Sequence, residues 1–169
     1  MTARRCAGPR RAVARGFTLI ELLLVLVVVA VLAMVAVPSY TQYLVRGQRT
    51  AAKSALLQAA AMLERSYTAN GCYNYATAPA CQSQSGTAID MSGYAWAPND
   101  GSTKTYAITM SASAAQSFTL TATPCGSGAT CPAPSNTSFT DPDCGVLTLD
   151  STGNKTSSGN LTPVQCWSR

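Results

Sequence analysis

The most informative stretch of this chain is residues 15–40, RGFTLIELLLVLVVVAVLAMVAVPSY. From Phe17 to Val37 the only charged residue is Glu21, and nearly every other side chain is apolar. A helix of that length, at about 1.5 Å per residue, spans a bilayer core of about 30 Å. The stretch therefore predicts a helix that crosses a membrane.

The residues ahead of this helix give its orientation. The first fifteen residues contain no acid, and they contain Arg4, Arg5, Arg10, Arg11 and Arg15. By the positive-inside rule they place the N-terminus in the cytoplasm and export the rest. A cleaved secretory signal is the alternative, but its apolar region spans about 7–15 residues and ends at a small-x-small site. This run is longer, and Met34 and Ala36 match such a site poorly, so we expect a retained helix.

The cysteines agree with export to an oxidising compartment. Cys6 stands alone near the N-terminus, and the six others lie beyond residue 70. An even number of exported cysteines indicates disulfides. Pairing between neighbours closes the shortest loops, and we expect the pairs Cys72–Cys81, Cys125–Cys131 and Cys144–Cys166.

The motif at residues 15–21, a glycine followed by phenylalanine and then by a glutamate four residues later, resembles the processing signal of type IV prepilins and type II secretion pseudopilins. The resemblance implies cleavage after Gly16 by a prepilin peptidase, methylation of the Phe17 amine and assembly with other pilin subunits. It implies residence in the bacterial inner membrane first and in an extracellular type IV pilus afterwards. Residues 1–16 would then be the leader and residues 17–37 the transmembrane and assembly helix.

Glu21 is the one acid inside this apolar helix. An acid in such a position costs about 2.5–3.5 kcal/mol near the bilayer centre and usually marks function. After cleavage, the Phe17 amine and the positive end of the helix dipole lie within about one turn of it. In the pilin family the matching glutamate meets the terminal amine of a neighbouring subunit, which implies that Glu21 sets the stagger between subunits.

Beyond the membrane segment, residues 38–71 are predicted to form an amphipathic helix. This helix is expected to pack on the rest of the chain, residues 72–169, which is called the head. Pro38 removes a backbone donor, so we expect a kink or local unwinding there. Asn70-Gly71 predicts the end of the helix. The packed face is predicted from a spacing of three and four residues, and basic residues 46, 49, 53 and 65 are expected on the surface; the face consists of Ala52, Leu56, Ala59, Leu63 and Tyr67.

The rest of the chain predicts a small antiparallel sheet, giving an α+β fold. Residues 72–103 carry few periodic signals and are expected to form a long loop. Within residues 104–169, Lys104–Met110, Gln116–Thr123 and Val146–Asp150 alternate as half-buried strands do. Residues 151–154 predict a hairpin turn that continues through Lys155 and Thr156.

The head also resembles the PilE-type minor pilins. The resemblance rests on residues 65–71, 106–108 and 118–124, on the run from Cys144 to Thr156, and on Cys166-Trp167. It implies the type IV pilin fold and a structural subunit that supports pilus assembly, twitching motility and adhesion. An insertion at residues 125–134 departs from the family pattern.

Other functions fit the composition less well. Without histidine there is no Ser-His or Cys-His nucleophile, and no phosphate-binding glycine loop is present, so we expect neither an enzyme nor a cofactor. Asp141-Pro142-Asp143 is more typical of a turn than of a calcium site, since calcium takes about six to eight oxygens. We expect Trp167 to cover the last disulfide rather than to form a ligand platform.

Two alternatives to the structural pilin remain. A DNA-uptake pilin needs clustered cations, but residues 72–169 hold three basic residues against five aspartates, so a nucleic acid partner is not expected. A type II secretion pseudopilin would be confined to the periplasm and would have a calcium-stabilised head.

Overall fold

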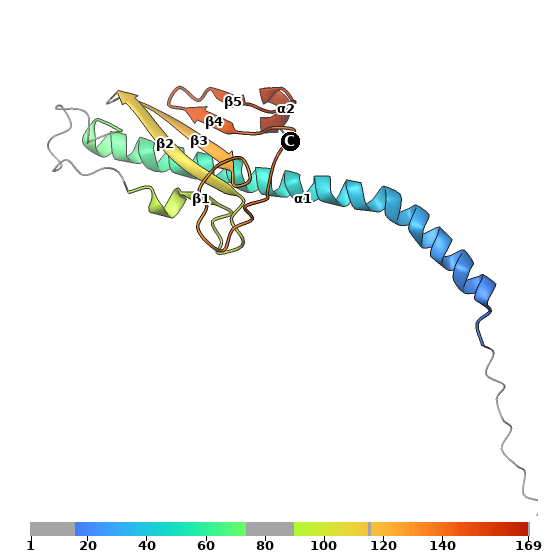
Figure 1. Ribbon diagram of the computed structural model, residues 1–169. Helices are drawn as coiled ribbons and strands as arrows, with labels where there is room; N and C mark the ends of the chain where they lie inside the picture. The colour runs from blue at the N-terminus through green and yellow to red at the C-terminus, as the bar shows by residue number, and fades with distance from the viewer. Residues whose placement is uncertain (1–15, 74–89, 115, 169) are drawn as a thin grey trace, which may run out of the picture. The chain divides into compact units, whose positions relative to one another are not determined.

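The structure, a computed structural model of the 169-residue chain, describes residues 16–73, 90–114 and 116–168 (Figure 1). The chain divides into two compact units, Met1–Thr41 and Gln42–Arg169. The first contributes the beginning of helix α1 (Leu19–Asn70), and the second contains the rest of α1 and the sheet.

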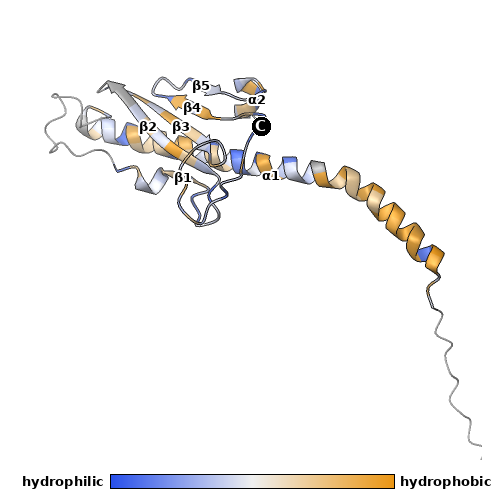
Figure 2. Ribbon diagram, in the orientation of Figure 1, coloured by the Kyte–Doolittle hydropathy of each residue, from blue (hydrophilic) through white to orange (hydrophobic). Residues whose placement is uncertain are grey.

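The first part of α1 is apolar and exposed. Thr18 caps its N-terminus, where the backbone N–H of Glu21 donates to Thr18 Oγ1 over 3.3 Å. Among the described residues, α1 is long and apolar enough to cross a membrane. Figure 2 shows the hydrophobic colouring of its first part. The helix assignment continues through Pro38, so the local unwinding expected there is absent. A proline inside a helix removes one hydrogen bond, and the bonds on either side can maintain the helix.

The helix ends where the sequence predicts. Its last residue is Asn70, and Gly71 follows with a φ of 76°, a left-handed conformation that glycine adopts without a Cβ clash. The Gly71 N–H donates to the Tyr67 carbonyl over 2.6 Å, so one of the carbonyl groups at the end of the helix has a hydrogen-bond partner.

The described residues of the head form a five-stranded antiparallel sheet in the order β1-β2-β3-β4-β5. This confirms the predicted α+β architecture and its three longer strands. The expectation that residues 72–103 form only a loop is wrong, because Ser92–Tyr94 is a 3-10 helix (η2) and β1 lies within this range; residues 74–89 lie outside the described residues. The strands are β1 (Trp96–Ala97), β2 (Tyr106–Ala114), β3 (Ser117–Pro124), β4 (Leu147–Asp150) and β5 (Lys155–Ser157).

The predicted hairpin joins β4 to β5. Asp150 holds its turn, because its carboxylate accepts hydrogen bonds from the backbone N–H of Thr152 and Asn154 and from the Thr152 hydroxyl. After β5, the short helix α2 (Pro163–Ser168), which the sequence did not predict, packs against this edge strand.

The core lies between the second half of α1 and one face of the sheet. Along β3 the burial alternates strictly, as a half-buried strand requires. Four of the five residues predicted for the packed helix face are buried, and the fifth, Tyr67, is partly buried and stacks on Tyr73. The largest core residues from the sheet side are Tyr106, Ile108, Phe118, Leu120, Leu147 and Leu149.

Candidate functional site

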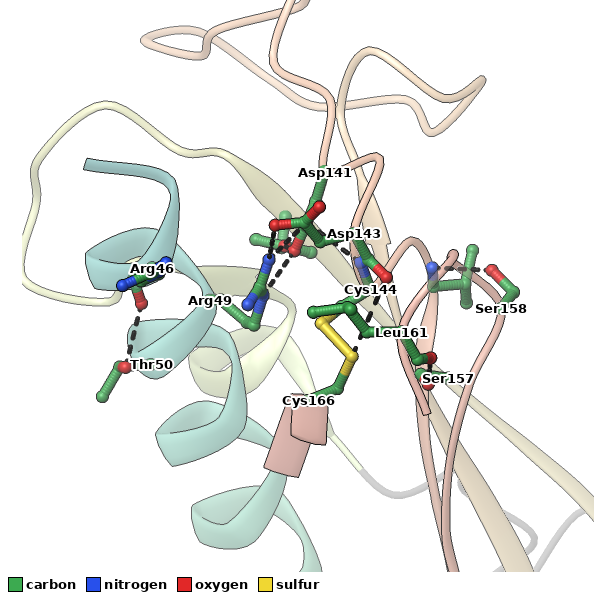
Figure 3. A network of polar contacts seen from close by, with 12 residues as sticks. Arg46, Arg49, Thr50, Asp141, Asp143, Cys144, Ser157, Ser158, Leu161 and Cys166 are labelled. Carbon is green, nitrogen blue, oxygen red and sulfur yellow. Dashed lines mark hydrogen bonds and ion pairs between the residues drawn. A yellow bond between two sulfur atoms is a disulfide. The ribbon is translucent and has the colours of Figure 1, made fainter. Parts of the chain in front are cut away.

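A buried ion pair ties α1 to the loop before β4. Arg49 Nε donates to Asp141 Oδ2 over 2.7 Å, and Arg49 Nη2 donates to Asp141 Oδ1 over 2.7 Å (Figure 3). Both residues are buried, with 2% of each exposed. The expectation that Arg49 lies on the surface is therefore wrong. Its position was readable, because Arg49 precedes Ala52 by three residues and so extends the spacing of the packed face.

Two more groups complete the bonding of Asp141. The Tyr106 hydroxyl donates to Asp141 Oδ2 over 2.8 Å, and the Cys144 backbone N–H donates to Oδ1 over 3.1 Å. Asp143 lies at the edge, with its Oδ2 3.5 Å from Arg49 Nη2. Since protein donors occupy both Asp141 oxygens, this carboxylate is a structural anchor. In the part of the chain that the structure describes, no buried side-chain polar atom lacks a hydrogen-bond partner.

The pKa values follow from this arrangement. Burial alone would raise the pKa of Asp141, but the hydrogen bonds from Arg49, Tyr106 and Cys144 outweigh it and hold that pKa below its ordinary value. The hydrogen bond to Asp141 raises the pKa of Arg49, against the effect of burial. Burial is the main cause that raises the pKa of Tyr106, and the negative charge of Asp141 raises it further. At neutral pH the buried part of the network consists of the Arg49 cation, the Asp141 anion and the neutral Tyr106 phenol.

This network makes the stability of the head depend on pH. Because the folded pKa of Asp141 lies below the unfolded value of about 3.9, its contribution is complete above that value and is lost as the pH falls through the folded pKa. We expect urea unfolding of the full chain between about pH 5 and 2 to show a steeper loss of unfolding free energy than the Asp141→Asn variant shows. Equal slopes for the two proteins would contradict this.

Two disulfides lie in the described part of the head, and both belong to the expected pairs. Cys144–Cys166, with Cα atoms 5.7 Å apart, joins the Asp141 loop to α2, and both of its residues are fully buried. Cys125–Cys131, with Cα atoms 5.8 Å apart, closes the insertion. Cys72 is disulfide-bonded, but its expected partner, Cys81, lies outside the described residues.

Removing the buried disulfide should destabilise the head more than removing the other one. Replacing Cys144 and Cys166 with alanine frees residues 22 positions apart, for which loop entropy gives a loss of about 3 kcal/mol. The matched control replaces Cys125 and Cys131, 6 positions apart, for which the expected loss is about 2 kcal/mol. Denaturant unfolding of both variants measures the difference. A smaller loss for the Cys144–Cys166 variant than for the control would count against this order.

The insertion at residues 125–134 packs back on Lys104, which lies just before β2. The Lys104 backbone N–H donates to the Pro134 carbonyl over 3.0 Å, and the Lys104 carbonyl accepts from Asn136 N–H over 2.8 Å. Lys104 Nζ also lies 3.4 Å from the Ala133 carbonyl. The insertion is therefore an integral, hydrogen-bonded part of the head.

A second polar cluster lies at the C-terminal edge of the sheet and is named the C-terminal patch: Lys53, Lys155, Thr156 and Trp167. Lys155 Nζ lies 5.3 Å from the Trp167 ring centroid. The Trp167 indole N–H donates to the Thr156 carbonyl over 3.0 Å, and Lys53 Nζ lies 3.5 Å from the Trp167 carbonyl. Trp167 was expected only to cover the last disulfide. It packs against the core and also contacts the polar groups of Lys155 and Thr156.

The processing residues lie at the start of the described chain. Gly16 and Phe17 are exposed and precede α1, and Glu21 is exposed in its first turn. Pro38 lies within the helix, well separated in sequence from the head contacts described above. These residues therefore belong to the unit Met1–Thr41, whereas the Asp141 network belongs to the unit Gln42–Arg169.

Comparison with known proteins agrees with this division of the chain. A family model described as "Type IV minor pilin ComP, DNA uptake sequence receptor" matches residues 38–148. The prokaryotic N-terminal methylation motif matches residues 11–37. The crystal structure of the non-core minor pilin PilV of Neisseria meningitidis is similar, with a TM-score of 0.46 and 21% identity over 72% of this chain and 94% of that chain. No curated protein matches the sequence.

The two matched regions adjoin at Pro38 and together run from residue 11 into β4. The longer match covers more than half of the 169 residues. The chain belongs to the type IV minor pilin family described as ComP, DNA uptake sequence receptor.

Proposed function

We propose that this minor pilin binds DNA at the cell surface and serves as a receptor in DNA uptake. The observation that carries the proposal is the family match over residues 38–148, which includes most of the head. Of the two alternatives to the structural pilin, the family description supports the DNA-uptake pilin. It conflicts with the expectation that nucleic acid is not a partner. Roles in twitching motility and adhesion stay predictions.

The net charge of residues 72–169 does not include the cations of the second half of α1. The compact unit that contains the head begins at Gln42, so the cations of the second half of α1 belong to it. Residues 42–169 hold seven basic and six acidic residues, a net charge of +1 rather than −2. One of the acids, Asp141, is buried against Arg49. DNA binding depends on the cations that can reach phosphates at the contact surface rather than on the net charge of the whole unit.

The same proposal includes the path to the pilus. Cleavage after Gly16 leaves Phe17 as the methylated N-terminus, and the methylation-motif match over residues 11–37 supports this processing. The subunit first resides in the inner membrane through the apolar part of α1 and then enters the fibre. We assign Glu21 the role of meeting the terminal amine of a neighbouring subunit.

Selection from a random duplex library tests the DNA proposal. The full chain, purified in a non-ionic detergent, is incubated with the library at low salt, and retained DNA is amplified and sequenced over several rounds. We expect one short motif to be enriched, because specific binding usually exceeds non-specific binding by at least about a thousandfold. Retention of no DNA, or of all sequences equally, would overturn the receptor proposal.

A further inference from the structure

The C-terminal patch brings together three segments that are distant in the sequence. Lys53 comes from α1, Lys155 and Thr156 from β5, and Trp167 from α2. Strand β5 is an edge of the sheet, and α2 packs on it (Figure 1). Lys155 and Thr156 are exposed, while Lys53 and Trp167 are partly buried. The patch is therefore an accessible surface with a fixed aromatic centre.

The charge around the patch favours an anionic partner. From Ser151 to Arg169 the sequence contains two basic residues and no acid. The nearest acid before this segment, Asp150, has its carboxylate engaged by three donors of its own turn. Asp143 faces Arg49 instead. Lys155 therefore lies in a segment of the sequence without acidic side chains.

Trp167 holds Lys155 in a defined position. The ammonium group lies 5.3 Å from the ring centroid, within the range of a cation–π contact, and the bond from the indole N–H to Thr156 fixes the ring. The Thr156 hydroxyl is hydrogen-bonded to the Thr148 hydroxyl on the neighbouring strand. Lysine ammonium and threonine hydroxyl groups are ordinary phosphate contacts in protein–DNA interfaces.

We infer that the C-terminal patch contacts the phosphate backbone of duplex DNA, an inference that rests on the proposed function. Lys155 binds a phosphate, and Trp167 positions Lys155. A lysine on an edge strand also discourages strand pairing with other molecules. That role does not require the tryptophan contact or the lysine contributed by α1. The two roles therefore predict different results when DNA binding is measured.

The first test measures the salt dependence of binding. The full chain in a non-ionic detergent is titrated against a fluorescein-labelled duplex of random sequence, with anisotropy as the readout. Lys155→Ala should weaken binding by roughly tenfold at 0.1 M salt and lower the salt slope by about one, as expected for one lost phosphate contact. The matched control is Lys104→Ala, which removes the same charge from the insertion side of the head and should leave the slope unchanged.

The second test uses the two tryptophans of the chain as reporters. Trp96 lies in β1 and Trp167 next to β5, at opposite edges of the sheet. In Trp96→Phe the remaining tryptophan is Trp167, and its emission should change when the duplex is added. In Trp167→Phe the remaining tryptophan is Trp96, and its emission should stay constant.

The outcomes separate the two proposals. If the unaltered chain binds no duplex, the proposed function fails. If it binds, but Lys155→Ala behaves as Lys104→Ala does and Trp167 emission stays constant, DNA binding stands and the inference about the patch is overturned.

Discussion

Arg49→Ala is expected to lower the free energy of unfolding by about 3–5 kcal/mol, because it leaves a buried carboxylate without its counter-ion. Asp141 is 2% exposed, and Arg49 supplies two of its hydrogen bonds. The Tyr106 hydroxyl and the Cys144 N–H remain in the variant, but neither carries the positive charge that offsets burial. Without the Arg49 side chain, the loop before β4 should detach from α1.

Denaturant unfolding of the full chain, followed by near-ultraviolet circular dichroism, measures this loss. Arg46→Ala is the matched control, because Arg46 is an exposed arginine one turn earlier on the same helix. Its effect should be within about 0.5 kcal/mol. Replacing Arg49 with methionine and Asp141 with leucine together should recover much of the stability, since no charge is then buried. An Arg49→Ala variant as stable as Arg46→Ala would refute the anchor role.

Glu21→Gln is expected to prevent incorporation into pili while leaving cleavage after Gly16 intact. The variant keeps the size and the hydrogen-bonding capacity of the side chain. It removes the negative charge that is proposed to attract the terminal amine of a neighbouring subunit. Without that attraction, nothing specific sets the stagger of an otherwise uniform apolar helix.

Quantitative mass spectrometry of sheared pili and of membranes measures both steps. Glu64→Gln serves as the control, since it removes the other glutamate of the chain, which lies exposed near the end of α1. We expect the processed Glu21→Gln chain in membranes only and the Glu64→Gln chain in both fractions. Finding Glu21→Gln in pili at the wild-type level would contradict the assembly role.

The elements predicted correctly are those whose signals are local. The apolar run, the three-and-four spacing of the helix face and the Asn70-Gly71 stop depend on neighbours in the sequence, and the structure confirms them. Strand β1 was missed because two residues carry no periodicity and pair only when β2 is present. The kink at Pro38 stays a prediction, although the unwinding does not occur.

The Arg49–Asp141 pair shows why the centre of the head was not predicted. The partners are 92 residues apart, and an arginine on a helix is usually exposed. Its place in the packed-face spacing was a signal, but only a carboxylate at the same depth makes the position acceptable. The C-terminal patch likewise depends on tertiary contacts among α1, β5 and α2, which a count of charges along the sequence does not detect.

The most direct measurement of the central proposal is the amount of labelled duplex DNA that cells take up with and without this subunit. Cells that lack the chain are compared with cells that express it again, and pili are counted in the same samples. We expect uptake to be lost while pili are still present, and to return with the intact chain. Wild-type uptake by piliated cells that lack the chain would contradict a role as a DNA receptor.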